Sequence, residues 1–192
     1  TMACLAEVLG FGLAGSATAP AVHADRLRIA EETGRIAARL ATDPKAVRPT
    51  DLVTERSLDN AMRILLALCG STNALVHLAA IAGRAGIRLS LRRLNELAET
   101  TPVLVNLKPV GSNYMEDLHA AGGMPALMWE LRHLLNLDCP TVTGETLGDR
   151  LSGFDPGIID HSVIRRFDEP IEPKGGLIAL FGNLAPDGAI LK

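Results

Sequence analysis

Two apolar helical patterns meet in the stretch Leu66-Ala67-Leu68-Cys69-Gly70-Ser71-Thr72-Asn73-Ala74-Leu75-Val76-His77-Leu78. Ser, Thr and Asn side chains satisfy the free N–H groups of a first helical turn, and glycine permits backbone conformations that other residues avoid. The corner at residues 70–73 therefore predicts a helix start. Free N–H groups and the positive end of the helix dipole also attract a carboxylate or phosphate. Capping of a buried helix is the first interpretation, and gripping an acid substrate is the second.

The chain on both sides of this corner is rich in helical patterns, and apolar residues with helical spacing recur over most of its length. The segment 71–85 is apolar almost all round, which predicts a buried helix. Asp25, Ser57 and Ser90 are expected as helix N-caps. Short strands are expected at 103–107 and 141–144 and after residue 177. These patterns predict a helix-rich α/β fold, with helices over residues 2–9, 25–40, 57–66, 71–85, 91–98, 115–121 and 125–135.

The character of the sequence changes between residues 155 and 170, where Pro and Gly precede a β segment with turn residues. We expect residues 1–160 to be the later part of an α/β domain, and residues 161–192 to begin a mostly β, barrel-like domain. The chain starts at Thr1 within an apolar helical pattern and stops at Lys192 within an expected strand. This suggests an internal piece of a longer protein.

The composition bounds the class of protein. Of 192 residues, 47% are hydrophobic and 21% are charged, which indicates a globular chain. The net charge of -3 is made of interspersed signs, which argues against a nucleic-acid partner. The sequence has neither a long apolar run nor a secretory pattern, so a cytoplasmic location is expected. Cys4, Cys69 and Cys139 lie far apart, and each is expected to be a small buried residue rather than a metal ligand.

Polar residues elsewhere suggest further candidates. Lys108 follows the expected strand at 103–107, where α/β proteins often bind ligands, and it could meet an acid. Ser112 and Asn113 share its loop and could contribute to substrate discrimination. His77 could face a cluster or a carbonyl, although a hydrogen-bonded core histidine is the favoured interpretation.

Two other motifs are interpreted as structural. Glu116 and Asp117 are adjacent on a helix and point in different directions, so they are expected at a solvated helix start. Gly122-Gly123 is expected to form a packing turn, because no Lys and Ser/Thr follow it as in a phosphate-binding loop.

Several strings occur together in one order along essentially the whole chain. These strings are Gly70-Ser71-Thr72-Asn73-Ala74 followed by His77, Pro102-Val103-Leu104, Lys108-Pro109 with Gly111, Met115-Glu116-Asp117, Ala121-Gly122-Gly123-Met124-Pro125-Ala126, Thr141-Val142-Thr143-Gly144 and Gly182-Asn183-Leu184-Ala185-Pro186-Asp187-Gly188. In these strings the chain resembles the dihydroxy-acid and sugar-acid dehydratases, a family that includes phosphogluconate dehydratases.

The resemblance implies a hydro-lyase that converts a 2,3-dihydroxy acid or an aldonic acid to the 2-keto-3-deoxy acid. It also implies an iron–sulfur cluster and Mg²⁺ as Lewis acids, whose ligands are expected before Thr1 and after Lys192. No catalytic residue or metal ligand is therefore expected within this segment. The candidates for the substrate or cluster environment are Ser71, Thr72, Asn73, His77, Lys108, Ser112 and Asn113.

The substrate is open at this point. Residues 110–117 and 1–7 are more similar to the sugar-acid branch, such as L-arabinonate dehydratase, than to the dihydroxy-acid dehydratase of branched-chain amino-acid biosynthesis, which is the alternative. A phosphorylated sugar acid would need a basic pocket that the sequence does not indicate. A catalytically inert scaffold fragment is the alternative of another class. The expected partners are a small hydroxy acid and a second copy of the parent subunit, with neither nucleic acid nor membrane.

Overall fold

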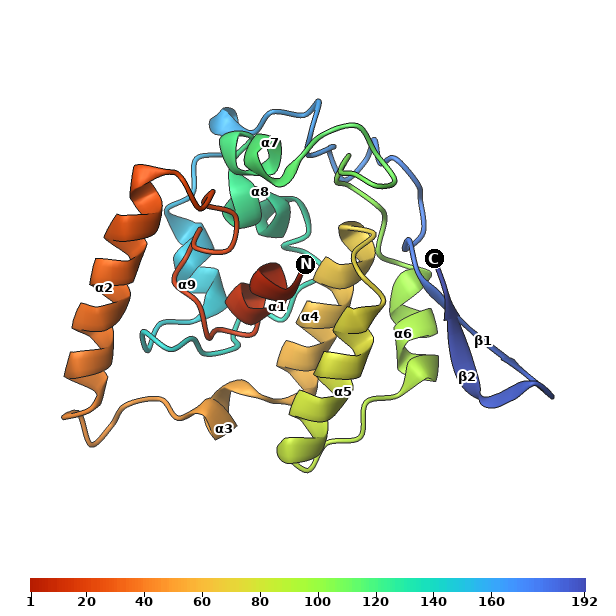
Figure 1. Ribbon diagram of the computed structural model, residues 1–192, viewed down its shortest axis with the longest axis horizontal. Coiled ribbons are helices and arrows are strands. Elements are labelled where there is room, and N and C mark those ends of the chain that lie inside the picture. Colours follow the sequence, from red (N-terminus) through yellow and green to blue (C-terminus); the bar gives the residue numbers. More distant parts are fainter.

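The computed structural model describes all 192 residues and confirms a helix-rich fold with a small sheet near its C-terminal end (Figure 1). The two strands pair with each other in an antiparallel hairpin. The elements are α1 (Met2–Val8), α2 (Ala24–Leu40), α3 (Pro49–Leu52), α4 (Glu55–Ala67), α5 (Asn73–Arg84), α6 (Leu91–Ala98), α7 (Met115–Ala120), α8 (Gly123–Glu130), α9 (Leu147–Ser152), the 3-10 turn η1 (Pro156–Ile158), β1 (Ile178–Gly182) and β2 (Ala185–Leu191).

Helix α4 is the centre of the core and contacts α1, α5 and α6. It begins with a capping box: Ser57 N–H donates to Thr54 Oγ1 at 3.1 Å, and Thr54 N–H donates to Ser57 Oγ at 2.9 Å. Nine of its 13 residues are buried, so nearly every face of the helix packs against a neighbour. Together with the surrounding elements, it forms one contiguous cluster of 36 buried apolar residues.

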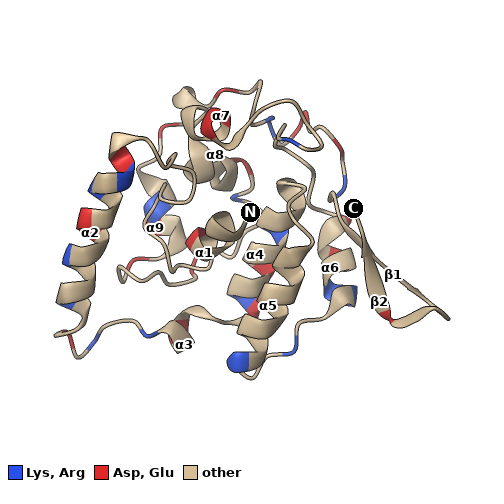
Figure 2. Ribbon diagram, viewed as in Figure 1, with Lys and Arg blue, Asp and Glu red and all other residues tan.

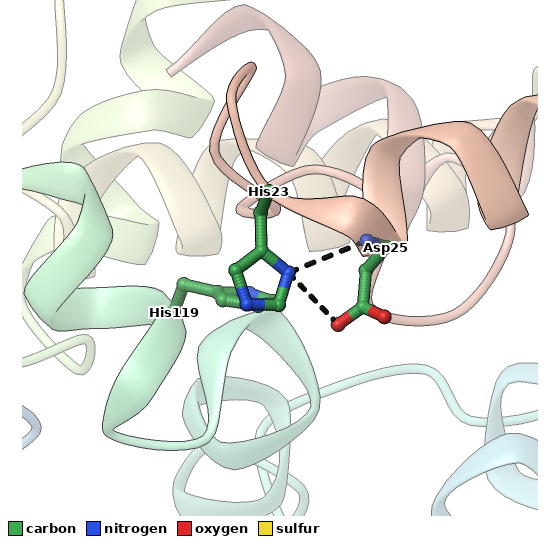
Figure 3. Close-up of side chains that lie close together, drawn as sticks. All are labelled: His23, Asp25 and His119. Atoms are coloured by element: carbon green, nitrogen blue, oxygen red, sulfur yellow. Dashed lines mark hydrogen bonds and ion pairs between the residues drawn. The ribbon is translucent and has the colours of Figure 1, made fainter.

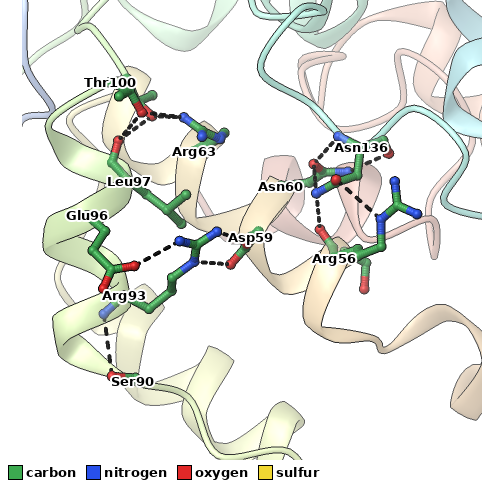
Figure 4. Close-up of polar contacts among 12 residues, drawn as sticks. Arg56, Asp59, Asn60, Arg63, Ser90, Arg93, Glu96, Leu97, Thr100 and Asn136 are labelled. Carbon is green, nitrogen blue, oxygen red and sulfur yellow. Dashed lines mark hydrogen bonds and ion pairs between the residues drawn. The ribbon is translucent and has the colours of Figure 1, made fainter.

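Side-chain amides tie distant segments to the helices. Asn60, fully buried on α4, accepts a hydrogen bond from Asn136 N–H at 2.8 Å and donates one to its carbonyl at 3.0 Å (Figure 4). Asn95 on α6 pairs in the same way with both backbone groups of Ala179, each at 2.8 Å. Arg93 links α6 to α4 through its ion pair with Asp59 (Figure 4). Polar side chains therefore fix the loop at Asn136 to α4 and strand β1 to α6.

The prediction of a regular strand at residues 103–107 is wrong. Val103 and Val105 form only isolated bridges, to Glu172 and Ile164. The N–H groups of Leu104 and Val105 donate instead to the carbonyl of Ala67, the last residue of α4. This segment is buried because it caps the end of α4, so its β-branched residues serve packing rather than a sheet. The predicted strand at 141–144 is likewise a turn.

Several helix boundaries differ from the predictions. The N-cap of α2 is His23 and not Asp25, because the His23 ring nitrogen accepts the Asp25 N–H. Ser57 is the third residue of α4 and not its cap. Ser90 is confirmed as the cap of α6. Helix α8 ends at Glu130, earlier than expected, and turns continue to residue 135.

Helix α5 is not buried all round, which corrects the prediction from its apolar composition. Its buried residues are Ala74, Leu75, Leu78 and Ala82, whereas Val76 is 68% exposed. The helix lies beside α4 at the surface of the molecule (Figure 1). One face packs against the core, and the opposite face is apolar and open.

The last segment packs on the same core as the helices. Val163, Ile164 and Leu177 are all buried members of the apolar cluster. The division into residues 1–160 and 161–192 stays a prediction. No helix is both long enough and apolar enough to cross a bilayer. Basic and acidic residues are interspersed along the chain, for example on α2 (Figure 2).

Candidate functional site

The corner between α4 and α5 is a tight turn, as its sequence suggests. Its unusual backbone conformation, however, lies at Cys69, one residue before Gly70. The positive φ, +43°, belongs to Cys69 rather than to Gly70. Gly70 is required for space, because a Cβ there would lie 2.8 Å from both Leu65 Cδ1 and Thr1 Cγ2. The corner therefore combines a left-handed cysteine with a glycine that is packed from two sides.

The corner caps α5 only in part. Ser71 Oγ accepts the N–H of Asn73 at 3.3 Å, and Ser71 N–H donates to Thr1 Oγ1 at 3.1 Å. Thr72 is the N-cap, but its side chain accepts no capping hydrogen bond. The backbone N–H of Thr72 has no acceptor within the chain. The start of α5 thus retains a donor for a bound group.

A cavity of about 400 Å³ opens at this corner and brings part of the predicted set together. Ser71 and Thr72 line it together with Lys108 and Pro109. Lys108 lines the cavity and no acidic side chain does, so the side-chain charge of the internal residues favours an anion. The complete lining is Thr1, Leu68, Cys69, Gly70, Ser71, Thr72, Leu107, Lys108, Pro109, Met115 and Lys192.

Lys108 is held by its neighbour Tyr114. The Lys108 ammonium hydrogen-bonds the Tyr114 hydroxyl and lies 3.9 Å from the centre of that ring. Both residues are exposed, so the ammonium remains in contact with water. A cation–π contact of this kind orients the lysine without neutralising its charge.

The other predicted residues do not line this cavity. Asn73 is the first residue of α5 and is exposed. His77 is exposed too and lines an apolar groove with α1 residues such as Met2 and Leu5. The interpretation of His77 as a hydrogen-bonded core residue is therefore wrong, because the face of α5 that carries it points away from the core.

Ser112 and Asn113 are used within their own loop. Asn106 Nδ2 donates to Ser112 Oγ at 3.1 Å, and Ser112 N–H donates to Asn106 Oδ1 at 2.9 Å. Asn113 Nδ2 donates to the Asn106 carbonyl at 3.0 Å. A Cβ on Gly111 would meet Asn106 Oδ1 at 2.1 Å, so only glycine fits this turn. The two side chains shape the loop that carries Lys108.

Thr1 and Lys192 line the cavity but lie outside the predicted set. They are 191 positions apart, and no spacing rule in the sequence connects them. Burial raises the pKa of the Cys69 thiol, and the charge of Lys192 opposes that shift. Cys69 Sγ also contacts the Gly176 carbonyl at 3.5 Å. Thr1 and Lys192 could be identified only from the contacts that the two ends of the chain make with the corner in the folded structure.

The cysteines do not form an iron–sulfur ligand set. Cys4 and Cys139 are buried, Cys69 is half-buried, and all three are free thiols. None belongs to a group of three or more side chains that could share a metal ion. Iron–sulfur clusters are bound through several thiolates, so the residues of this chain do not fit that group by themselves.

The geometry defines a helical scaffold with a cavity at the corner between α4 and α5, and similarity to known proteins identifies its family. The sequence profile of the dihydroxy-acid/6-phosphogluconate dehydratase N-terminal family matches residues 1–150. The chain therefore belongs to this family.

Individual relatives carry names that are consistent with this family. The chain is 43% identical over 194 residues to the dihydroxy-acid dehydratase of Acetivibrio thermocellus, and 44% identical over 194 residues to that of Caldicellulosiruptor bescii. It is also 44% identical over 195 residues to the dihydroxy-acid dehydratase of Methanococcoides burtonii. Each alignment covers 100% of this chain and 34% or 35% of the relative. The chain thus spans about a third of the length of these curated relatives.

Proposed function

We propose that this chain is part of a hydro-lyase that removes water from a 2,3-dihydroxy acid, and that the corner cavity binds the carboxylate of that acid. The observation that carries the proposal is the cavity itself, which is lined by Ser71, Thr72 and Lys108 and by no acidic side chain. Membership of the dehydratase family supplies the reaction class.

The donors of the cavity suit a carboxylate. The free N–H of Thr72 and the start of α5 offer a fixed partial positive charge. Lys108, oriented by Tyr114, adds a full charge to the lining of the same cavity. Hydrogen bonds from charged or dipolar donors to a carboxylate are stronger than neutral ones, so these groups would bind and orient the acid.

The branched dihydroxy acid is the favoured substrate. The relatives described above are named dihydroxy-acid dehydratases, which supports the branched-chain reading over the L-arabinonate reading that the sequence first suggests. Ser112 Oγ accepts a hydrogen bond from Asn106, and Asn113 Nδ2 donates one to the Asn106 carbonyl, so both side chains are partly committed to their own loop and offer fewer free groups for the extra hydroxyls of an aldonate. The iron–sulfur cluster, Mg²⁺ and subunit pairing stay predictions about the whole protein.

The test is the rate of dehydration by the full-length protein with a branched 2,3-dihydroxy acid and with an aldonate, each followed as formation of the 2-keto acid. We expect faster turnover of the branched acid. In the Lys108→Gln variant we expect KM to rise about 10- to 100-fold, since loss of one charged contact costs about 1.5–3 kcal/mol. Lys174→Gln is the matched control, because Lys174 pairs with Glu99 on the surface.

The outcomes separate the reaction from the site. Dehydration of neither acid by the wild-type protein would contradict the reaction class. Normal dehydration with an unchanged KM in Lys108→Gln would leave the reaction intact and remove Lys108 from carboxylate binding.

A further inference from the structure

Two histidines and an aspartate from distant parts of the chain gather where α2 begins beside α7 (Figure 3). His23 is the N-cap of α2, Asp25 lies in its first turn, and His119 belongs to α7. One potential ligand atom from each residue lies within 4.8 Å of the other two. His23 is exposed, and the other two are half-buried, so an ion could reach them from solvent.

Asp25 presents one oxygen to this cluster. Its Oδ2 lies 3.1 Å from His23 Nδ1, whereas its Oδ1 pairs with Arg28. The hydrogen bond from Arg28 lowers the pKa of Asp25, so the carboxyl is ionised at neutral pH. One carboxylate oxygen is therefore held by the guanidinium, and the other faces the imidazoles.

His119 is oriented by a buried hydroxyl. Its Nδ1 lies 3.1 Å from Thr18 Oγ1, and Thr18 is only 3% exposed. This contact leaves Nε2 as the ring nitrogen available to the cluster. A histidine that binds a metal usually has its second nitrogen hydrogen-bonded in this way, which fixes the ring orientation. The rings of His119 and His23 meet edge to face, with centroids 5.6 Å apart.

We propose that His23, Asp25 and His119 bind one divalent transition-metal ion of the Zn²⁺ type. Two imidazoles and one carboxylate form a ligand set that suits Zn²⁺, whereas Mg²⁺ and Ca²⁺ prefer oxygen ligands alone. Donors about 2.1 Å from a tetrahedral ion are about 3.4 Å apart, so ligand atoms that lie within 4.8 Å of one another need to close by at most about 1.4 Å. His23 is exposed, and its ring could make that movement by giving up the 3.3 Å contact in which its Nδ1 accepts the Asp25 N–H. Water would occupy the fourth position.

The site would fasten α2 to the body of the molecule. Ile36 is the only buried residue of this 17-residue helix. At its start, Arg26 donates to the carbonyls of Ser16 and Ala19, and His23 and Asp25 lie beside His119. An ion shared by α2 and α7 binds only the folded arrangement, so it would stabilise the attachment of the helix.

The test measures zinc binding, which requires no dehydratase activity. The full-length protein is stripped of loosely bound metal and titrated with Zn²⁺ in competition with a chromophoric chelator. We expect the wild type to bind one more Zn²⁺ per chain than His23→Asn, Asp25→Asn and His119→Gln. Co²⁺ should give a visible absorption band that these variants lack. The difference between wild type and variant separates this site from any other metal site in the protein.

The variants are chosen to preserve the fold. Asn is a good N-cap, so His23→Asn keeps a side-chain acceptor at the start of α2. His133→Gln is the matched control, because His133 is exposed, packs on Phe167 and belongs to no ligand cluster. It should bind zinc like the wild type. If His119→Gln fails to fold, His23→Asn and Asp25→Asn decide the question. Equal zinc stoichiometry and equal Co²⁺ spectra in the wild type and these two variants would overturn the proposal.

Discussion

Glu7 is a carboxylate buried beneath a loop, and two opposing effects act on its charge. It is 1% exposed, and its two oxygens accept the N–H groups of Gly15 and Ala17, each at 2.7 Å. Burial raises the pKa of Glu7, whereas the two N–H donors and the nearby charge of Arg150 oppose that shift. The side chain therefore holds residues 15–17 against α1 at the expense of its own solvation.

The pKa of Glu7 leads to a prediction about stability and pH. Because the folded state raises this pKa above the unfolded value, the native state binds the proton more tightly than the unfolded chain does. The ordinary pKa of a glutamate side chain is about 4.5. The contribution of Glu7 to the free energy of unfolding is then fully present below about pH 4.5 and is lost as pH rises through the raised pKa. Glu7→Gln cannot titrate, so its stability should lack this loss.

Urea unfolding of the wild type and of Glu7→Gln between pH 4 and pH 7 measures the difference directly. We expect the wild type to lose stability relative to the variant as pH rises. Carboxylates such as Asp149, whose pKa is lowered by hydrogen bonds from Thr146, are present in both proteins and cancel. If the wild type instead became more stable than the variant as pH rises above 4.5, the two N–H donors and Arg150 would lower the pKa of Glu7 by more than burial raises it.

At the scale of single residues, the sequence indicates which polar side chains are candidates for a site, but it does not indicate their exposure or backbone conformation. Three of the candidates named from the sequence, Ser71, Thr72 and Lys108, line one cavity. His77 cannot be placed from its sequence neighbours, because its exposure depends on which side of α5 meets α4. The positive φ of Cys69 is also invisible in the sequence, where the adjacent Gly70 is the residue expected to adopt it.

Helix α4 depends on its first turn. Thr54 and Ser57 satisfy each other's backbone N–H groups, and Ser57 Oγ also donates to the Leu52 carbonyl at 2.6 Å. Thr54→Ala should lower the free energy of unfolding by about 1–2 kcal/mol, because it removes one of the two capping acceptors. Thr50→Ala, on the exposed surface of α3, should change it by less than about 0.5 kcal/mol. Equal urea midpoints for the two variants would contradict the role of this cap.

Elements with strong local signals are predictable, and those that depend on distant partners are not. The helix at 91–98 follows from its spacing and from the Ser90 cap, and the structure confirms both. Residues 103–105 look like a strand because they are apolar and β-branched. Their backbone groups instead pair with Ala67, Ile164 and Glu172, which the local sequence cannot indicate.

At the scale of the molecule, the question is whether the last segment folds with the helices. The backbone of Val105 bridges that of Ile164, and Ile164 is fully buried in the same cluster as α4 residues such as Ile64. The cavity shows the same dependence, since its walls include Thr1 and Lys192. Segments on both sides of the predicted boundary at residue 160 thus share one core, and cooperative unfolding is the expected consequence.

Ile164→Ala tests this cooperativity. Removing a fully buried isoleucine side chain should lower the free energy of unfolding by about 2–5 kcal/mol. If the segment belongs to the helical core, helical circular dichroism and Trp129 fluorescence should both shift to lower urea by the same amount. Ile158→Ala is the matched control, since Ile158 is 58% exposed on η1. Loss of a separate transition, with the helical signal unchanged, would instead mean that residues after 160 fold as a unit of their own.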